Sequence, residues 1–317
     1  MTAELEPLRR IAAYAHCTDP DGRVLLVRAA PGTGTPGVWS LPGGGVDHGE
    51  HPHRTVAREV AGETGLAVQT DQVVRVLSDL RALPHRSLAL HTDRLIYQAA
   101  VVGTVSDQEP NGTVDRAHWV PVAEAAGLPL RPFTAAVLGL PPGEGDLRPE
   151  DPPDLPSFLI LPGPDGRHRT QRFAAYAVAT DPVGRVLLTR IAEGYPGAGA
   201  WHLPGGGTDF GEDPTVALLR EVTEETGQRG EITGLLGVAS HRDPDCLGPE
   251  GYPIDWHGVR AFYRVEVADA TEPVVYDLGG STAAAAWFGA DEVAGLRLTE
   301  ATREAFASAD LGVTLRD

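Results

Sequence analysis

The sequence predicts an α/β (α+β) sandwich that occurs twice in tandem, each copy being a mixed β-sheet flanked by helices. Three observations support this fold class. The chain has 317 residues, a length that favours two modest domains over one. Residues 10–66 align with residues 172–228 without a gap, and 33 of the 57 aligned positions are identical. Each copy also contains several strand-like apolar segments and few helical ones.

The repeat continues beyond the aligned segment. An HxxRxxY motif that begins at His91 reappears at His257, and AGLPL after Trp119 matches AGLRL after Trp287. A stacked solenoid is excluded, because its units are shorter and more numerous. A Pro-rich acidic segment separates the copies and reads as an extended linker. The predicted organisation is therefore a first domain over 1–140, a linker over 141–158 and a second domain over 159–317.

The first half of each copy predicts a strand and then a glycine-rich loop. Residues 24–27 and 186–188 are apolar and follow a Pro-x-Gly turn, so they are expected to be the second strand of a hairpin. The sequence Trp-x-LPGGG follows at Trp39 and again at Trp201.

The second half predicts a helix, further strands and a closing helix. Pro52 and Pro214 fit the first position of a helix, and Gly65 and Gly227 fit its left-handed C-terminal cap. Residues 94–102 and 260–268 are expected to be later strands. A helix is expected near the end of each copy, after the late tryptophan.

Composition excludes several classes of protein. The net charge of −18 argues against a nucleic-acid-binding protein, because phosphate neutralisation needs a basic surface. All 26 basic residues are Arg, so Schiff-base lysine chemistry and a lysine-containing ATP-binding loop are excluded. Cys17 and Cys246 have no metal-ligand spacing. No apolar run is long enough for a signal peptide or a membrane span, so a cytoplasmic protein without a membrane partner is expected.

Acidic residues cluster near the end of the second predicted helix. Glu221 and Glu225 are four residues apart and share one helix face, and Glu224 lies beside them. Such closely spaced like charges repel, and divalent cations would neutralise them. Oxygen ligands favour Mg²⁺ or Mn²⁺, and phosphate oxygens of the substrate complete the coordination of such an ion. Arg220 is expected to pair with Glu212 and to hold the carboxylates in register.

This pattern resembles the Nudix box, GX5EX7REUXEEXGU, in which U is an aliphatic residue. The second copy matches every fixed position and departs only at the last U, where Gln228 stands. The first copy has Gly62 in place of the first Glu of the EE pair. Its matching positions are Gly44, Glu50, Arg58, Glu59, Val60, Glu63, Gly65 and Leu66. The chain is therefore identified as similar to a tandem Nudix hydrolase.

The resemblance implies an activity and a set of site residues. Family members bind Mg²⁺ through the box and hydrolyse a nucleoside diphosphate linked to another group, with water attacking a phosphorus. Catalytic roles are implied for Glu212, Arg220, Glu221, Glu225 and, as a loop acid, Asp277. Metal ligands are implied at the Gly205 carbonyl and at Glu221, Glu224 and Glu225. In the first copy Glu59 and Glu63 would remain as metal ligands, so the chemistry is expected mainly in the second copy.

Four further residues are candidates for substrate binding. Arg28 and Arg190 end the strands ahead of the glycine loop, where a guanidinium could hold phosphate oxygens, although an exposed strand-end Arg explains them equally. Trp39 and Trp201 could stack on a nucleobase, and core packing is the competing explanation.

Two alternatives to a general nucleotide hydrolase stay open. One is a ligand-binding or regulatory Nudix protein with little catalysis, which the incomplete first box favours. The other is a phosphohydrolase specific to one biosynthetic diphosphate, because the box does not specify the substrate. The two copies could also pack as an intramolecular pseudo-dimer.

Overall fold

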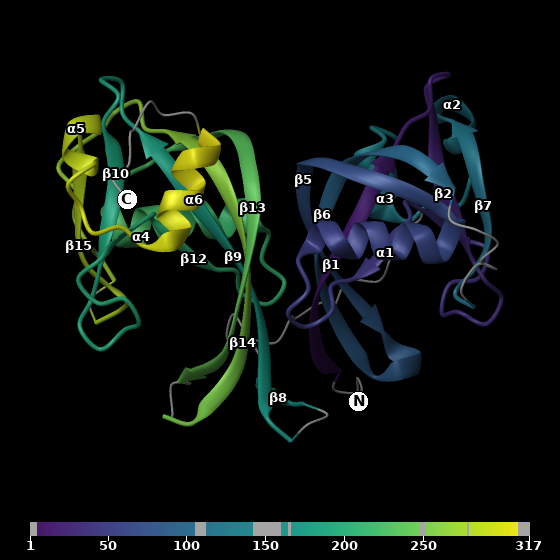
Figure 1. Ribbon diagram of the computed structural model, residues 1–317, viewed down its shortest axis with the longest axis horizontal. Helices are drawn as coiled ribbons and strands as arrows, with labels where there is room; N and C mark the ends of the chain where they lie inside the picture. Colours follow the sequence, from purple (N-terminus) through teal and green to yellow (C-terminus); the bar gives the residue numbers. More distant parts are fainter. Residues whose placement is uncertain are drawn as a thin grey trace. The chain divides into compact units, whose positions relative to one another are not determined.

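The computed structural model describes residues 5–104, 112–141, 160–163, 166–247, 251–277 and 279–309 (Figure 1). The chain divides into two compact units, residues 1–154 and 155–317. Almost all of the predicted linker lies outside the described residues. No helix in the described part of the chain is long and apolar enough to cross a membrane.

The first unit contains two sheets and a central helix. The larger sheet has the strand order β4-β1-β6-β5 and the smaller sheet has the order β3-β2-β7. Helix α1 packs against β1, β4 and β5. The bounds are β1 (Glu6–Cys17), β2 (Arg23–Ala29), β3 (Trp39–Ser40), β4 (Gly43–Gly45), α1 (Pro52–Thr64), β5 (Leu66–Leu83), η1 (Pro84–Arg86), β6 (Leu88–Thr104), β7 (Val114–Pro121), α2 (Val122–Ala125) and α3 (Pro132–Val137).

The second unit repeats this arrangement within one connected sheet. Its main path is β11-β10-β9-β14-β13, with β8 and β12 on β9 and with β15 on β10. The bounds are β8 (Ile160–Pro162), β9 (His168–Thr180), β10 (Val186–Ile191), β11 (Trp201–His202), β12 (Gly205–Gly207), α4 (Pro214–Thr226), β13 (Glu231–Leu247), β14 (Pro253–Glu266), β15 (Thr282–Phe288), α5 (Ala290–Val293) and α6 (Glu300–Ala309). The mixed sheets and few helices confirm the predicted fold class.

Both units share one strand register around the glycine-rich strand. Tyr14 of β1 lies opposite Gly43, and Tyr176 of β9 lies opposite Gly205. These two glycines have φ values of +146° and +134°, and an added Cβ would lie 2.3 Å from the carbonyl oxygen of Ala13 or Ala175. Only glycine allows this close antiparallel contact, which fixes the loop beside the helix.

The helix ends agree with the sequence prediction. Pro52 and Pro214 begin α1 and α4, and Gly65 and Gly227 cap them in the left-handed conformation. The expected hairpin forms only at its base, where Thr18 bridges Val24 and where Thr180 pairs with Val186. Beyond that pair the chain diverges, so that β2 pairs with β7 and β10 pairs with β15.

A buried ion pair joins the central parallel strands of the first unit. Arg9 of β1 donates from Nε and Nη2 to Oδ2 of Asp93 in β6, at 3.1 and 3.0 Å. Asp93 is 0% exposed. The corresponding strand β9 has Gln171 instead of Arg9, and its amide contacts Nδ1 of His257 at 3.0 Å. The two units therefore differ at the centre of an otherwise common framework.

Candidate functional site

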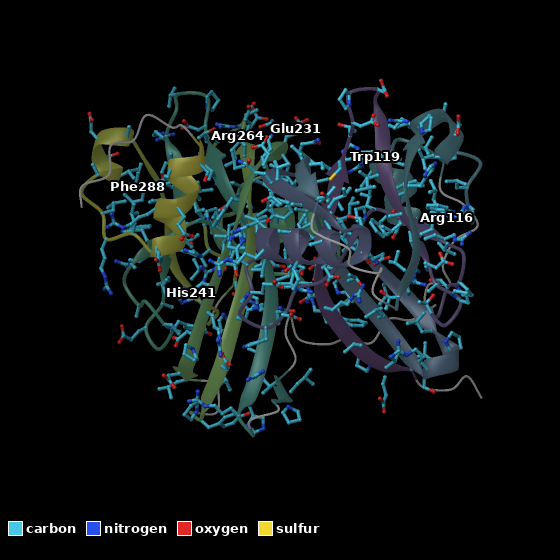
Figure 2. The ribbon with its side chains drawn as sticks, turned by 45° about the vertical axis from the view of Figure 1, so that its right-hand side comes forward. Arg116, Trp119, Glu231, His241, Arg264 and Phe288 are labelled. Carbon is cyan, nitrogen blue, oxygen red and sulfur yellow. The ribbon has the colours of Figure 1, made fainter. Side chains whose placement is uncertain are left out.

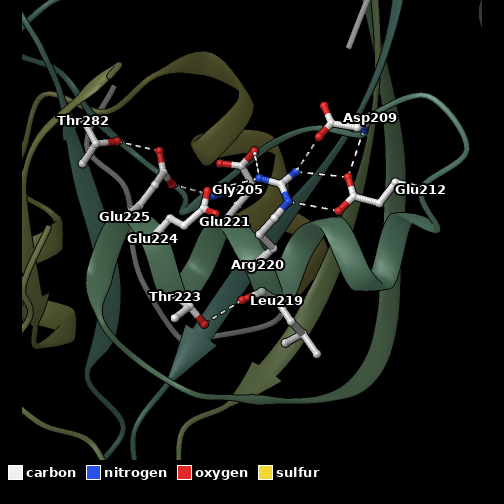
Figure 3. Close-up of polar contacts among 10 residues, drawn as sticks. All are labelled: Gly205, Asp209, Glu212, Leu219, Arg220, Glu221, Thr223, Glu224, Glu225 and Thr282. Atoms are coloured by element: carbon white, nitrogen blue, oxygen red, sulfur yellow. Dashed lines mark hydrogen bonds and ion pairs between the residues drawn. The ribbon is translucent and has the colours of Figure 1, made fainter. Parts of the chain in front are cut away.

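The last two turns of α4 place three carboxylates beside the glycine-rich strand β12 (Figure 3). The αL cap at Gly227 ends the helix one residue after Thr226. A contact between α4 and β12 brings the helix against this strand. Glu225 therefore meets the backbone of Gly205, Glu221 lies beside Gly206, and Glu224 shares the same helix end.

Glu225 is the most buried of these acids, with 6% exposure. Its Oε2 accepts a hydrogen bond from the Gly205 N–H at 2.9 Å, and its Oε1 accepts one from Thr282 Oγ1 at 2.5 Å. Burial raises the pKa of Glu225 to about 7 against these two hydrogen bonds, and the charges of Glu221 and Asp277 add to the rise. The carboxylate is thus held rigidly in a site where its negative charge is not fully compensated.

Arg220 organises the outer side of the site. Its Nε and Nη2 donate to the two carboxylate oxygens of Glu212, both at 3.0 Å, as the sequence predicted. Its Nη1 donates to Glu221 at 3.1 Å and to Glu224 at 3.2 Å. One guanidinium therefore donates to three carboxylates, lies 3.8 Å from a fourth on Asp209, and sets the positions of two predicted metal ligands.

Glu221 packs directly beneath the glycine strand. A Cβ added at Gly206 would lie 2.8 Å from Glu221 Oε1, so a larger residue would displace the carboxylate. Burial raises the pKa of Glu221, and Arg220 opposes that rise. At Gly206 glycine is therefore needed for space.

Asp277 lies next to the helix end. The N–H groups of Tyr276 and Asp277 donate to the carbonyl of Glu224 at 2.7 and 3.2 Å. Asp277 is exposed, and its charge raises the pKa of Glu225. The loop acid predicted from sequence therefore lies within electrostatic reach of the carboxylate cluster.

The donor atoms of the second unit suit a hard divalent cation. They are the oxygens of three carboxylates on one helix end and a carbonyl on the adjacent strand. Two of these carboxyl groups, Glu221 and Glu225, have raised pKa values. Among the described residues no three acidic, His or Cys side chains already converge on one point, and Arg220 holds Glu221 and Glu224 instead. Metal binding by Glu221, Glu224, Glu225 and the Gly205 carbonyl would supply the positive charge that the cluster lacks.

The first unit keeps part of this arrangement. Glu63 is 6% exposed and accepts a hydrogen bond from the Gly43 N–H at 2.9 Å, as Glu225 does from Gly205. Glu59 pairs with Arg58 at 2.6 Å. Gly62 provides no side chain where the second unit has Glu224.

A second difference between the units lies outside the helix. Strand registers place Val114 opposite Ala29, and Thr282 opposite Ile191. Val114 therefore stands where Thr282 donates to Glu225, and it offers no hydroxyl. Burial raises the pKa of Glu63 to about 8, and Glu63 has no counterpart of the Thr282 hydrogen bond that lowers the pKa of Glu225. Thr282 could not be found from the sequence, because it lies 57 residues after its partner and outside any motif.

Comparison with known families gives one decisive match. The sequence model of the NUDIX domain matches the chain twice, over residues 8–138 and 170–309. Together these stretches cover most of the chain. The chain belongs to the Nudix family.

Individual Nudix relatives match shorter stretches. A MutT-like protein of Streptomyces ambofaciens is 39% identical over 70 residues, which are 22% of this chain and 43% of that protein. An ADP-ribose pyrophosphatase of Methanocaldococcus jannaschii is 38% identical over 76 residues, 23% of this chain and 44% of the relative. This chain thus spans less than half the length of these two relatives. The solved structure of a MutT Nudix hydrolase from Burkholderia pseudomallei is 32% identical in sequence. The aligned region covers 44% of this chain and 98% of that structure, with a TM-score of 0.36.

The four predicted substrate-binding residues of this Nudix protein lie on the strands that flank the glycine loop. Arg28 pairs with Asp115 at 2.8 Å and lies 5.9 Å from the centre of the Trp39 ring. Trp39 is 7% exposed within the core of the first unit, which favours the packing interpretation. Arg190 lies 6.0 Å from the ring centre of the half-buried Trp201. Their roles in substrate binding stay predictions.

The buried carboxylate of the first Nudix box predicts a pH-dependent stability in metal-free protein. The folded-state pKa of Glu63, about 8, lies above the ordinary value of 4.5, so folding favours the protonated acid. This stabilisation is complete below about pH 4.5 and is lost as the pH rises through 8. Glu63→Gln mimics the protonated form. As the pH rises from 5 to 8, the free energy of unfolding of this variant is expected to increase relative to that of wild type by on the order of 3 kcal/mol. Urea unfolding in EDTA measures the difference.

A matched control for that experiment is Glu124→Gln, at an exposed position of α2. Its stability difference from wild type should not change with pH. A Glu63→Gln difference that is equally independent of pH would contradict the burial argument.

Proposed function

We propose that this chain is a divalent-metal-dependent pyrophosphohydrolase that cleaves a nucleoside diphosphate linked to another group, with its chemistry in the second unit. One observation carries the proposal. Glu225 is buried against the Gly205 N–H and Thr282, with Glu221 and Glu224 on the same helix end. Relatives named ADP-ribose pyrophosphatase and RNA pyrophosphohydrolase support this reaction class.

Each residue then has a defined task. Glu221, Glu224, Glu225 and the Gly205 carbonyl would hold Mg²⁺ or Mn²⁺. When bound, the ion stabilises the charge that develops on phosphoryl oxygens and orients water. Arg220 and Glu212 position the carboxylates. Asp277, exposed beside the cluster, would accept the proton of the water that attacks phosphorus as the bridging P–O bond breaks.

The first experiment is product release from a nucleotide panel with Mg²⁺. The panel holds normal and oxidised dNTPs, ADP-ribose, NADH, dinucleoside polyphosphates and nucleotide sugars. Metal-dependent release of phosphate-containing products from one class supports the proposal and names the group linked to the diphosphate. Absence of turnover on every compound contradicts it and favours the alternatives, a ligand-binding Nudix protein or a hydrolase of one biosynthetic diphosphate.

We further propose that the two units associate as an intramolecular pseudo-dimer. The support is their common fold and their similar sequence over the aligned segment. Small-angle scattering is the test, since a profile of two independent lobes would contradict association.

A further inference from the structure

The first unit contains a cavity of about 410 Å³ beside the glycine-rich strand β4. Glu59 and Glu63 lie at its acidic end, and Tyr14 and Phe133 contribute aromatic walls. The remaining charged lining consists of five guanidiniums from separate parts of the unit, namely Arg10, Arg81, Arg86, Arg94 and Arg131. A volume of this size suits a small molecule rather than a polymer.

The charge of this cavity opposes that of the whole protein. Five arginines and two carboxylates line it, whereas the chain has a net charge of −18. Arginine stays protonated at any physiological pH. Glu59 already contacts Arg58 at 2.6 Å, so part of its charge is compensated from outside the cavity lining. Arg94 is likewise paired with Asp79, and the other four arginines still outnumber the two carboxylates, so the cavity is a cationic site on an acidic protein.

Two of the arginines are held in defined positions. Arg94, which is 3% exposed, donates from Nη2 to both oxygens of Asp79 at 2.8 and 2.9 Å and from Nη1 to Tyr14 Oη at 2.7 Å. Its guanidinium also lies 4.3 Å from the ring centre of Phe133. Arg131 donates from Nη2 to Thr35 Oγ1 at 2.5 Å. Side chains fixed in this way lose little entropy when an anion binds.

The second unit provides an internal comparison. Arg81 lies opposite Leu90, and the register of β13 and β14 puts Asp243 in the same place, opposite Trp256. Leu130 and Leu298 form equivalent bridges to Trp39 of β3 and Trp201 of β11, so Arg131 corresponds to Thr299. A third difference is Gly62 in place of Glu224. Each of the three differences makes the charge of the first site more positive than that of the second.

We propose that the first unit binds a small polyphosphorylated anion in this arginine cavity without needing a divalent cation. Guanidiniums match phosphate oxygens in charge and in paired hydrogen-bond geometry. The first unit has Arg81 where the second has Asp243, and Gly62 where the second has Glu224. It therefore lacks two carboxylates that would repel phosphate. The first unit is thus a ligand site of a different kind from the carboxylate site on α4.

Calorimetry with inorganic tripolyphosphate and EDTA tests this on the full-length chain. Without metal the phosphate chain is not expected to be hydrolysed, and the acidic site on α4 repels it. Wild type should bind one equivalent, with an affinity that falls as salt rises. Arg81→Asp, which copies the second unit, should weaken binding at least tenfold, and Arg86→Ser, at an exposed position, should weaken it as well.

The matched control is Arg116→Asp on β7, an exposed arginine outside the cavity lining (Figure 2). It changes net charge as Arg81→Asp does and should alter the affinity less than twofold. Equal weakening by both Asp variants, or no binding by wild type, overturns the proposal. Arg86→Ser keeps the test decisive if Arg81→Asp does not fold. Metal-dependent turnover by the second unit is measured separately, so failure of one proposal is distinguishable from failure of the other.

Discussion

Glu225→Gln is expected to lower metal-dependent diphosphate hydrolysis about 100-fold or more while the protein stays folded. The amide can still accept the hydrogen bond from the Gly205 N–H, so the position of the side chain is kept. What is lost is the negative charge of the buried oxygen pair, which a divalent cation needs. Steady-state turnover on the substrate identified from the panel measures the effect, with the thermal midpoint as a check of folding.

Glu63→Gln is the matched control, because Glu63 makes the same contact with Gly43 in the first unit. Turnover should change less than twofold. A comparable loss in both variants would contradict the assignment of the chemistry to the second unit. Full activity in Glu225→Gln would contradict the role of that carboxylate.

Arg220→Ala is expected to destabilise the metal-free second unit by about 1–3 kcal/mol. Its guanidinium contacts Glu212, Glu221 and Glu224, and its removal leaves these carboxylates repelling one another. Adding Mg²⁺ should recover part of the loss, because the ion supplies the missing positive charge. Urea unfolding with EDTA and then with saturating Mg²⁺ measures both quantities.

An exposed arginine of the same unit, Arg229, provides the comparison. Arg229→Ala should change the stability by less than about 0.5 kcal/mol in either condition. If Arg220→Ala behaves in the same way, the guanidinium does not hold the carboxylate cluster together.

Local signals in the sequence were sufficient for the helix that carries the site. Proline at the start, glycine at the αL cap and the four-residue spacing of Glu221 and Glu225 are physical constraints within one segment. The pairing of Arg220 with Glu212 follows from the same segment. These features could be predicted because all their partners are close in the chain.

Contacts between distant strands could not be read in this way. Thr282 reaches Glu225 only because β15 pairs with β10, and Val114 replaces it only through the equivalent pairing of β7. The arginine cavity was missed for the same reason, since Arg81 and Arg131 come from a strand and a loop with no common motif. The expected hairpin also formed only at its base, because after the turn β2 pairs with β7 and β10 pairs with β15.

The buried pair between Arg9 and Asp93 has a consequence for how this duplicated chain assembles. The equivalent residues of the second unit are Gln171 and Val259. During folding, two halves with similar sequences risk exchanging strands, and β1 and β9 share the sequence AAYA. Such an exchange would bury Asp93 beside Gln171 without its cation and Arg9 beside Val259, at a cost of several kcal/mol. This ion pair is therefore expected to disfavour pairing of β1 or β6 with a strand of the other unit.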